Sequence, residues 1–312
     1  MASSGSCFGF SPARWRDRQL TSFFQSCGLQ HVSLQVDHQT TIACWCEKTE
    51  TEEAIDISRP ALVLLHGFAT SAVWQWYEQV SPLKRNFRIF IPDLVFFGSS
   101  TTTSSERSEI FQAQMIAKTM KKMNVSSYSV VGTSYGGFVA YRLAHLFPST
   151  VEKVVIANSG VCITPKDNQE LLERAKMGSV EDLLLPRSPQ AFRTLSSLSI
   201  HRLPPFLFSF LLQSIIQYFY VEGREAKAEL LQGITLGLEN ADALPSVPQQ
   251  KVLLIWGDHD GIFPPAMAYE IKKHLGEKAE LMIISDAAHC VQMEKPKEFN
   301  SIVEKFLLNQ SP

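Results

Sequence analysis

Short apolar runs alternate with amphipathic stretches along most of the 312-residue chain. Apolar residues that recur every three or four positions predict helices, and short unbroken apolar runs predict buried strands. The predicted strands lie at 61–65, 87–93, 128–131, 151–157, 251–256 and 281–284, and predicted helices lie between them at 74–80, 108–123 and 267–274. This alternation favours an α/β fold, in which helices cover both faces of a mostly parallel sheet.

Two regions depart from this alternation. Residues 31–36 and 40–45 predict a hairpin across a polar turn. Residues 159–246 contain no convincing strand; they show helical stretches and then a very apolar run at 203–220. We therefore expect three parts: an N-terminal segment (1–28), a core (29–158 and 247–312) and a helical insertion (159–246).

Polar side chains with useful chemistry follow the predicted strands. Parallel strands end at the same edge of a sheet, and ligands bind there in folds of this class. We therefore expect one edge of the sheet to collect His66, Asp93, Ser134, Asn158, Asp260 and His289.

Ser134 lies in Gly-Thr-Ser-Tyr-Gly (132–136), between a predicted strand and a predicted helix. In a nucleophile elbow, this arrangement holds the serine hydroxyl exposed on a sharp turn, and small residues around it let strand and helix approach closely. A serine hydroxyl is a weak nucleophile at neutral pH and needs a base with an orienting acid. Ser134 is therefore the candidate nucleophile.

The base and the acid follow later in the chain. His289 comes after the apolar run 281–284 and is the candidate base. Asp258 and Asp260 both follow the strand 251–256 and compete as the acid. We favour Asp260 because it lies deeper in its loop, where it can turn toward a histidine on the next loop.

These motifs, in this order, resemble the α/β-hydrolase family over most of the chain. His66-Gly67-Phe68 resembles the oxyanion loop of that family, and His289 with Glu294-Lys295-Pro296 resembles its C-terminal segment. The stretch 93–100 resembles the Asp-Leu-Pro-Gly-Phe-Gly turn, with Val95 and Phe96 in place of proline and glycine. That departure resembles a plant branch of monoacylglycerol-lipase-like hydrolases.

The resemblance implies an α/β-hydrolase fold whose helical cap is inserted before the acid-bearing strand. It also implies an oxyanion hole made by the backbone N–H groups of Phe68 and Tyr135, and chemistry that needs no cofactor or metal. His66 either contacts substrate or holds its loop by a local hydrogen bond. Candidate residues for an apolar acyl route through the cap are Phe206, Phe208, Phe210, Leu211, Ile215 and Phe219, with Phe206 and Phe210 foremost.

Three functions fit these residues. The first is a serine hydrolase of a carboxylic ester with an apolar acyl chain, such as a monoacylglycerol or another small lipid ester. The second is a carbon–carbon-bond hydrolase of the meta-cleavage type, and the third is a hydrolase-fold receptor or binding protein. Epoxide hydrolases and dehalogenases of the family carry aspartate at the position of Ser134, which disfavours their chemistry.

Composition and charge narrow the range of functions and partners expected for the chain. A formal net charge of −2 gives no electrostatic footprint for nucleic acid. The six cysteines show no paired spacing for zinc, and Cys290 beside His289 is interpreted as a small apolar filler. No apolar segment is long enough to cross a membrane. The expected partner is a small apolar ester, with peripheral membrane contact through the cap.

The remaining expectations concern assembly and location. A monomer or homodimer in the cytoplasm is expected. Serines and arginines within residues 1–18 faintly resemble a transit peptide.

Overall fold

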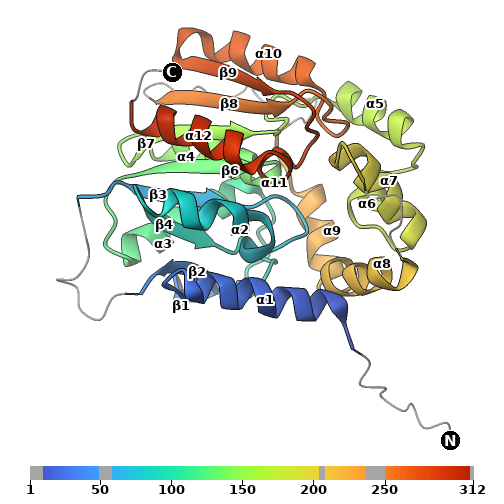
Figure 1. Cartoon of the computed structure of the whole chain (residues 1–312), viewed down its shortest axis with the longest axis horizontal. Coiled ribbons are helices and arrows are strands. Elements are labelled where there is room, and N and C mark those ends of the chain that lie inside the picture. Colours follow the sequence, from blue (N-terminus) through green and yellow to red (C-terminus); the bar gives the residue numbers. More distant parts are fainter. Residues whose placement is uncertain (1–9, 49–57, 204–207, 237–249, 310–312) are drawn as a thin grey trace, which may run out of the picture.

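One sheet runs through the centre of the molecule (Figure 1). The computed structural model describes residues 10–48, 58–203, 208–236 and 250–309. Within these ranges the sheet has nine strands in the order β1-β2-β4-β3-β6-β7-β8-β9, and β5 pairs with β2. The strands are β1 (Leu29–Gln35), β2 (Thr40–Glu47), β3 (Ala61–Leu65), β4 (Arg88–Pro92), β5 (Thr101–Thr102), β6 (Tyr128–Thr133), β7 (Val151–Ala157), β8 (Lys251–Gly257) and β9 (Ala279–Ile284).

The sheet is mostly parallel, and the predicted hairpin is present. From β4 to β9 every neighbouring pair is parallel, whereas β1 pairs antiparallel with β2, and β2 with β4. The predicted α/β fold with a mostly parallel sheet is confirmed. The predicted core strands agree with the observed ones to within a few residues.

Helices cover both faces of the sheet. The helices outside the cap are α1 (Pro12–Ser26), α2 (Ala72–Leu83), α3 (Glu109–Lys122), α4 (Tyr135–Leu146), α10 (Pro265–Leu275), the 3₁₀ turn η3 (Gly276–Lys278), α11 (Val291–Glu294) and α12 (Pro296–Leu307). Successive strand residues point to opposite faces. In β3, Val63 packs with α3 and α4, while Leu62 and Leu64 pack with α1, α2 and α12.

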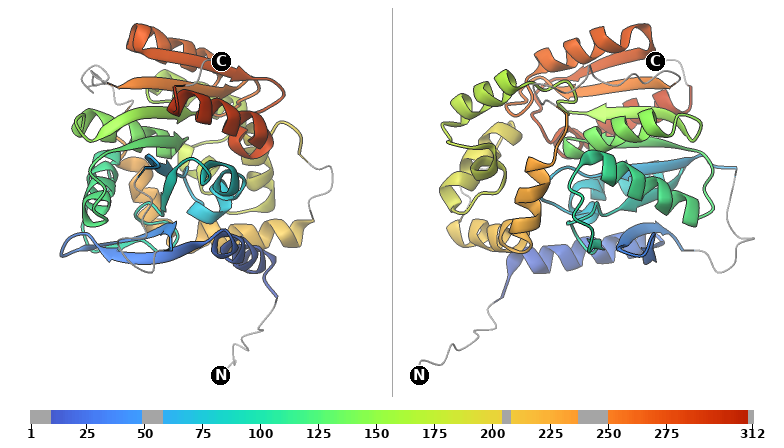
Figure 2. Two further views of the ribbon diagram at one scale, coloured as in Figure 1. Left: turned by 60° about the vertical axis from the view of Figure 1, so that its left-hand side comes forward. Right: turned by 180° about the vertical axis from the view of Figure 1, so that it is seen from behind.

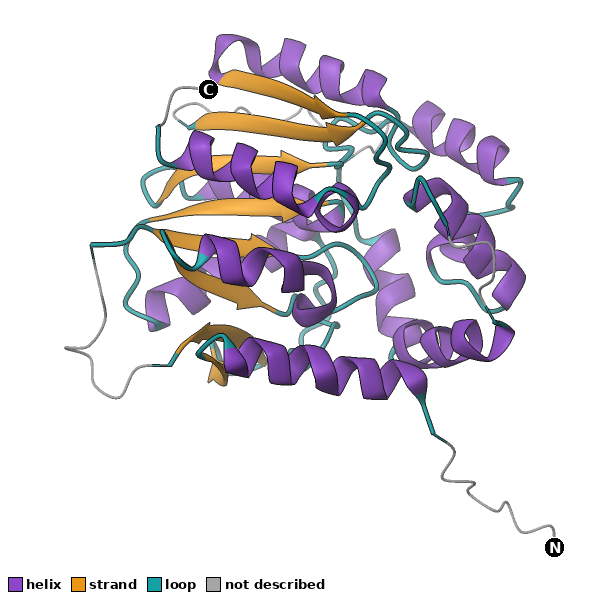
Figure 3. Ribbon diagram, viewed as in Figure 1, coloured by secondary structure: helices purple, strands orange, loops and turns teal. Residues whose placement is uncertain are grey.

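The insertion between β7 and β8 is helical, as predicted. Its described elements are α5 (Pro165–Ala175), α6 (Val180–Leu184), α7 (Pro189–Ser199), α8 (Ser209–Ile216), the π-helical turn η2 (Gln217–Val221) and α9 (Arg224–Gln232). Figure 3 shows these helices beyond the tips of the parallel strands, where they face the edge that carries the polar residues. The proposed domain limits stay a prediction.

An N-terminal helix, α1, was not predicted from the sequence. Ser11 caps its first turn. The buried side chains of Leu20 and Phe24 pack in the core with residues of β1 and α2. Figure 2 shows α1 running along the body and meeting α8 of the cap. There Ser11 Oγ lies 3.0 Å from Ser214 Oγ, and Arg14 pairs with Glu222. The helix therefore ties the cap to the body.

Gly136 gives a direct test of how closely the elbow packs. A Cβ atom at Gly136 would lie 2.2 Å from the carbonyl oxygen of Leu65 in β3. We predict that Gly136→Ala lowers the free energy of unfolding by more than about 2 kcal/mol, because strand and helix must separate. Gly178→Ala is the matched control, since no atom lies within 4 Å of its added Cβ. Urea unfolding measures both variants; equal stabilities would contradict this packing.

Candidate active site

The turn at Ser134 is strained. Ser134 lies between β6 and α4 with φ 51° and ψ −120°, a conformation that L-residues rarely adopt. Its N–H donates to Ala157 O at 3.0 Å, and its own carbonyl accepts from Ser159 Oγ at 2.6 Å. These bonds to β7 and the residues after it hold the turn in place. The structure thus gives Ser134 the backbone of a nucleophile elbow.

Asp260 and His289 meet across neighbouring loops. His289 Nδ1 lies 3.0 Å from Asp260 Oδ2 and 3.2 Å from Oδ1. The side chain of Asp260 is fully buried, and that of His289 is 11% exposed. A carboxylate on Nδ1 fixes the tautomer and leaves Nε2 free to act as a base. Both Ser134 and His289 line the same cavity.

Asp260 is held by three further donors. The N–H groups of Ile262 and Phe263 donate to Oδ1 at 2.8 and 3.0 Å, and Asn158 Nδ2 donates to Oδ2 at 2.6 Å. Together these donors fix the position of the Asp260 carboxylate. The sequence placed Asn158 at the correct edge of the sheet but did not indicate that it orients the acid.

The side chain of Asp258, the competing acid, faces His259 and not His289. Its Oδ1 lies 2.5 Å from His259 Nδ1 and accepts from Ala287 N–H at 3.3 Å. Its side chain is about one third exposed. The preference for Asp260 therefore agrees with the geometry, because only Asp260 contacts His289.

The loop that carries His289 is anchored on both sides. Glu294 Oε2 accepts from Ala288 N–H at 2.8 Å, and its other oxygen accepts from His201 N–H in the cap, also at 2.8 Å.

Cys290, the residue after His289, also lines the cavity. Burial raises the pKa of the Cys290 thiol to about 12, so the thiol stays protonated at neutral pH and is a poor nucleophile.

His66 holds the loop that leads to Phe68 and is not among the residues that line the cavity. This placement agrees with the alternative that His66 holds its loop by a local hydrogen bond, and its contact with substrate stays a prediction. The ring is fully buried. Nε2 accepts from Leu94 N–H at 2.9 Å, so the proton is on Nδ1, which donates to Gly67 O at 2.8 Å. On the other side, Gln75 Oε1 accepts from Gly67 N–H at 2.7 Å. Hydrogen bonds to both its N–H and its carbonyl oxygen therefore fix Gly67, the residue before Phe68.

The two proposed oxyanion donors are the backbone N–H groups of Phe68 and Tyr135. Phe68 lines the cavity just after the fixed Gly67, and Tyr135 opens α4 directly after Ser134. Among the described residues, neither backbone N–H donates to a protein acceptor. The first N–H groups of a helix lack intrahelical partners and carry partial positive charge. Their role as an oxyanion hole stays a prediction.

A cavity of about 300 Å³ opens beside Ser134. Its walls come from the oxyanion loop and α2 on one side and from the cap on the other, and they are mostly apolar. Among the described residues that line it, none is Lys, Arg, Asp or Glu. The cavity therefore suits a neutral, largely apolar ligand.

The cap residues predicted for the acyl route divide into two groups. Ile215 and Phe219 line the cavity, whereas Phe210, on the same helical segment, is 62% exposed and does not. The side chain of Phe210 therefore faces away from the cavity, and this geometry does not support its assignment to substrate binding. Phe206 lies outside the described residues. Phe208 and Phe210 are both exposed. Contact of the cap with a membrane surface stays a prediction.

Trp74 of α2 forms part of the cavity wall. Its ring meets Phe219 of the cap edge to face, with 4.9 Å between ring centroids. Its indole N–H donates to Asp17 Oδ1 in α1 at 2.8 Å. The N-terminal helix therefore fixes one side of the cavity through Trp74.

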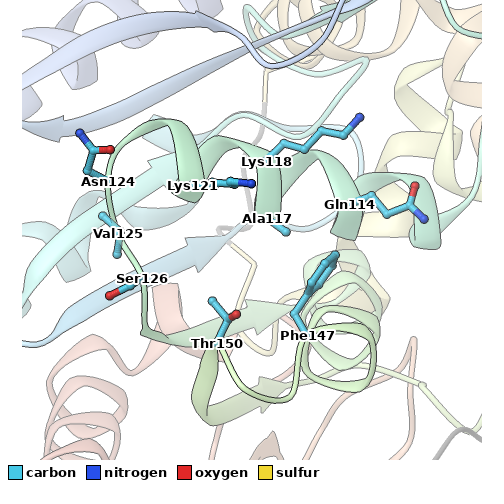
Figure 4. A pocket seen from close by; sticks show the side chains of 9 residues that line it. All are labelled: Gln114, Ala117, Lys118, Lys121, Asn124, Val125, Ser126, Phe147 and Thr150. Atoms are coloured by element: carbon cyan, nitrogen blue, oxygen red, sulfur yellow. The ribbon is translucent and has the colours of Figure 1, made fainter.

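Another surface pocket lies far from these residues. Figure 4 shows it between α3 and the segment that precedes β7. Ser126 and Thr150, which line it, come before β6 and β7, so the pocket lies at the opposite edge of the sheet from Ser134. Among the described residues, no group of three His, Cys, Asp or Glu could hold a metal ion, and no helix is long and apolar enough to span a membrane.

Comparison with known proteins agrees with the fold. The model of the alpha/beta hydrolase fold family matches residues 60–296, and the chain belongs to this family. Epoxide hydrolase 4 of Mus musculus is 21% identical over 282 residues, which are 81% of this chain and 74% of that protein.

Solved structures extend the likeness in fold. A bacterial membrane phospholipase A superposes with a TM-score of 0.78 at 22% identity, covering 96% of this chain and 92% of that one. The 2-hydroxy-6-oxo-6-phenylhexa-2,4-dienoate hydrolase of Rhodococcus superposes with a TM-score of 0.71 at 21% identity, covering 89% and 98%. At these identities the likeness is one of fold.

The two aspartates give a paired test of the site. We predict that Asp260→Asn lowers kcat/KM for an ester by roughly 10³–10⁴-fold, because His289 loses its fixed tautomer and its counter-charge. Asp258→Asn is the matched control and changes kcat/KM far less, since its carboxylate contacts the exposed His259. Steady-state kinetics measures both; the reverse order of effects would assign the acid to Asp258.

Proposed function

We propose that this protein is a serine hydrolase that cleaves a carboxylic ester with an apolar acyl chain through an acyl-enzyme. The observation that carries the proposal is that the strained Ser134 and the Asp260-paired His289 both line one cavity whose walls are mostly apolar. These groups match the parts of an acyl-transfer site: nucleophile, oriented base and adjacent space for an acyl group.

In the proposed reaction, Ser134 Oγ attacks the ester carbonyl while His289 Nε2 takes the hydroxyl proton. The backbone N–H groups of Phe68 and Tyr135 stabilise the oxyanion, each by roughly 3 kcal/mol in comparable sites. The tetrahedral intermediate collapses, the alcohol leaves with the proton from His289, and the acyl group remains on Ser134. Water then repeats the sequence: His289 takes its proton, and the carboxylic acid is released.

The family likeness alone leaves other reactions open. Ser134 stands where an epoxide hydrolase of this family would carry aspartate, so the similarity to Epoxide hydrolase 4 supports the fold and not that chemistry. The Rhodococcus enzyme is named for a dienoate, which is a carboxylate. Burying a carboxylate without a cation is costly, and no described residue that lines the cavity is Lys or Arg. A neutral ester is favoured over the carbon–carbon substrate for this reason.

A matched pair of phenylalanines tests the acyl site. We predict that kcat/KM rises with acyl length from two carbons upward, by roughly tenfold for every two methylenes, until the cavity is full. Phe219→Ala flattens this dependence because Phe219 lines the cavity, whereas Phe210→Ala leaves it unchanged because Phe210 faces outward. The measurement is kcat/KM for p-nitrophenyl esters of two to sixteen carbons. Preference for acetate, or equal effects of the two variants, would contradict the apolar acyl site.

A further inference from the structure

A second apolar cavity lies behind one wall of the cavity beside Ser134. We call the first the reaction cavity and the second the rear cavity. The rear cavity has a volume of about 280 Å³, and most of its lining residues come from α4, the cap helices α5, α6 and α9, and the loop after β8. Apart from Asn168, Glu181 and Gln232, the described residues that line it are apolar.

A partition of three apolar side chains separates the two cavities. Leu184, Ile262 and Phe263 line both of them. The ring of Phe263 has a neighbour on each side. Its centroid lies 5.5 Å from that of His289, which lines only the reaction cavity, and 6.0 Å from that of Phe138, which lines only the rear cavity. The ring of Phe263 therefore stands between the two spaces.

The backbone of Phe263 is fixed by contacts that also hold the acid. Its N–H donates to Asp260 Oδ1 at 3.0 Å, and its carbonyl oxygen accepts from Trp256 Nε1 at 2.8 Å. Gly160 lies against the ring, since a Cβ atom added there would be 2.7 Å from Phe263 Cδ1. The backbone cannot shift without moving Asp260. The size of the side chain at position 263 therefore decides whether the two cavities are joined.

The contact between Phe263 and His289 indicates which part of an ester the partition meets. In the proposed reaction the alcohol leaves with the proton of His289, so its oxygen must lie within hydrogen-bond reach of that imidazole. The acyl chain takes the wall around Ile215 and Phe219, and neither of these lines the rear cavity. The carbons of the alcohol therefore meet the ring of Phe263.

We propose that Phe263 is a specificity-determining residue whose ring limits the alcohol part of the ester to a short apolar group and closes the rear cavity to substrate. This inference rests on the proposed ester hydrolysis. The three side chains of the partition carry no polar atom, so they suit an apolar alcohol. The rear cavity of about 280 Å³ nearly equals the reaction cavity of about 300 Å³, so removal of the ring nearly doubles the space.

The experiment measures kcat/KM for ethyl, butyl and octyl butanoate, which share one acyl group. We expect the wild-type enzyme to prefer the butyl to the ethyl ester and to gain nothing from the octyl ester. Phe263→Ala raises the octyl-to-ethyl ratio of kcat/KM by roughly tenfold or more, because the octyl chain buries further methylenes in the rear cavity. The ratio cancels any effect on His289 that both esters share. Phe263→Leu gives a smaller rise and serves if Phe263→Ala does not fold.

Two further variants and a second ester series are the controls. Leu231→Ala widens the rear cavity behind an intact partition and keeps the wild-type octyl-to-ethyl ratio. Ala228→Phe, added to Phe263→Ala, fills the opened rear cavity and returns the ratio to the wild-type value. The ratio for ethyl octanoate against ethyl butanoate varies only the acyl chain, and Phe263→Ala leaves it unchanged.

Four outcomes overturn the inference: an octyl-to-ethyl ratio that neither Phe263 variant raises, an equal rise in Leu231→Ala, a rise that Ala228→Phe does not reverse, or a rise in the acyl ratio in place of the alcohol ratio. Failure of the wild-type enzyme to cleave any of these esters contradicts the proposed function instead. In that case, calorimetric binding of 1-octanol decides the inference. A Kd roughly tenfold lower in Phe263→Ala, reversed by Ala228→Phe, supports the partition, and an unchanged Kd overturns it.

Discussion

The close approach of the Ser134 turn to β3 is the constraint on which the rest of the site depends. The backbone at Gly136 touches the end of β3, where a Cβ atom would lie 2.2 Å from Leu65 O. A Cβ atom at Gly67 would lie 3.1 Å from Ser134 Cβ, so the oxyanion loop lies against the elbow. Because both contacts need small residues, the position of Ser134 and that of the loop at Gly67 are set together. The energy of the strained φ at Ser134 is offset by the parallel strands on either side.

The neighbouring loops complete the site from the other side. Asn158, at the end of β7, bonds to Asp260 after β8, which in turn bonds to His289 after β9. One chain of hydrogen bonds thus crosses three adjacent strand ends in order. The cap is connected to this chain, because Glu294 joins the His289 loop to His201. The cap therefore contacts the loop that carries His289.

Local sequence patterns predicted the parts of the fold that have a local cause. Strand periodicity located the core strands, and glycines around Ser134 indicated the elbow. The choice between Asp258 and Asp260 was a weaker inference, because both follow the same strand and only the path of the loop separates them. Phe96 occupies a left-handed position with φ 75°, where the family turn has glycine, and the ring packs under the Arg107 guanidinium.

The features that the sequence did not reveal depend on contacts between distant segments. The role of Trp74 is set by Asp17 in α1 and Phe219 in the cap, neither of which is near it in the chain. Phe210 and Phe219 belong to the same apolar run, yet one faces solvent and the other the cavity. Periodicity was uninformative there because the run changes from α8 to the π-helical turn η2, which shifts the facing residues.

The most direct test of the central claim is the intact mass of the protein during turnover of a slow ester substrate, followed by peptide mapping. The account predicts a transient mass increase equal to one acyl group, located on Ser134 and absent from Ser134→Ala. Steady turnover of the ester with no acyl group on the protein, or an acyl group on Cys290 or another residue, would contradict it.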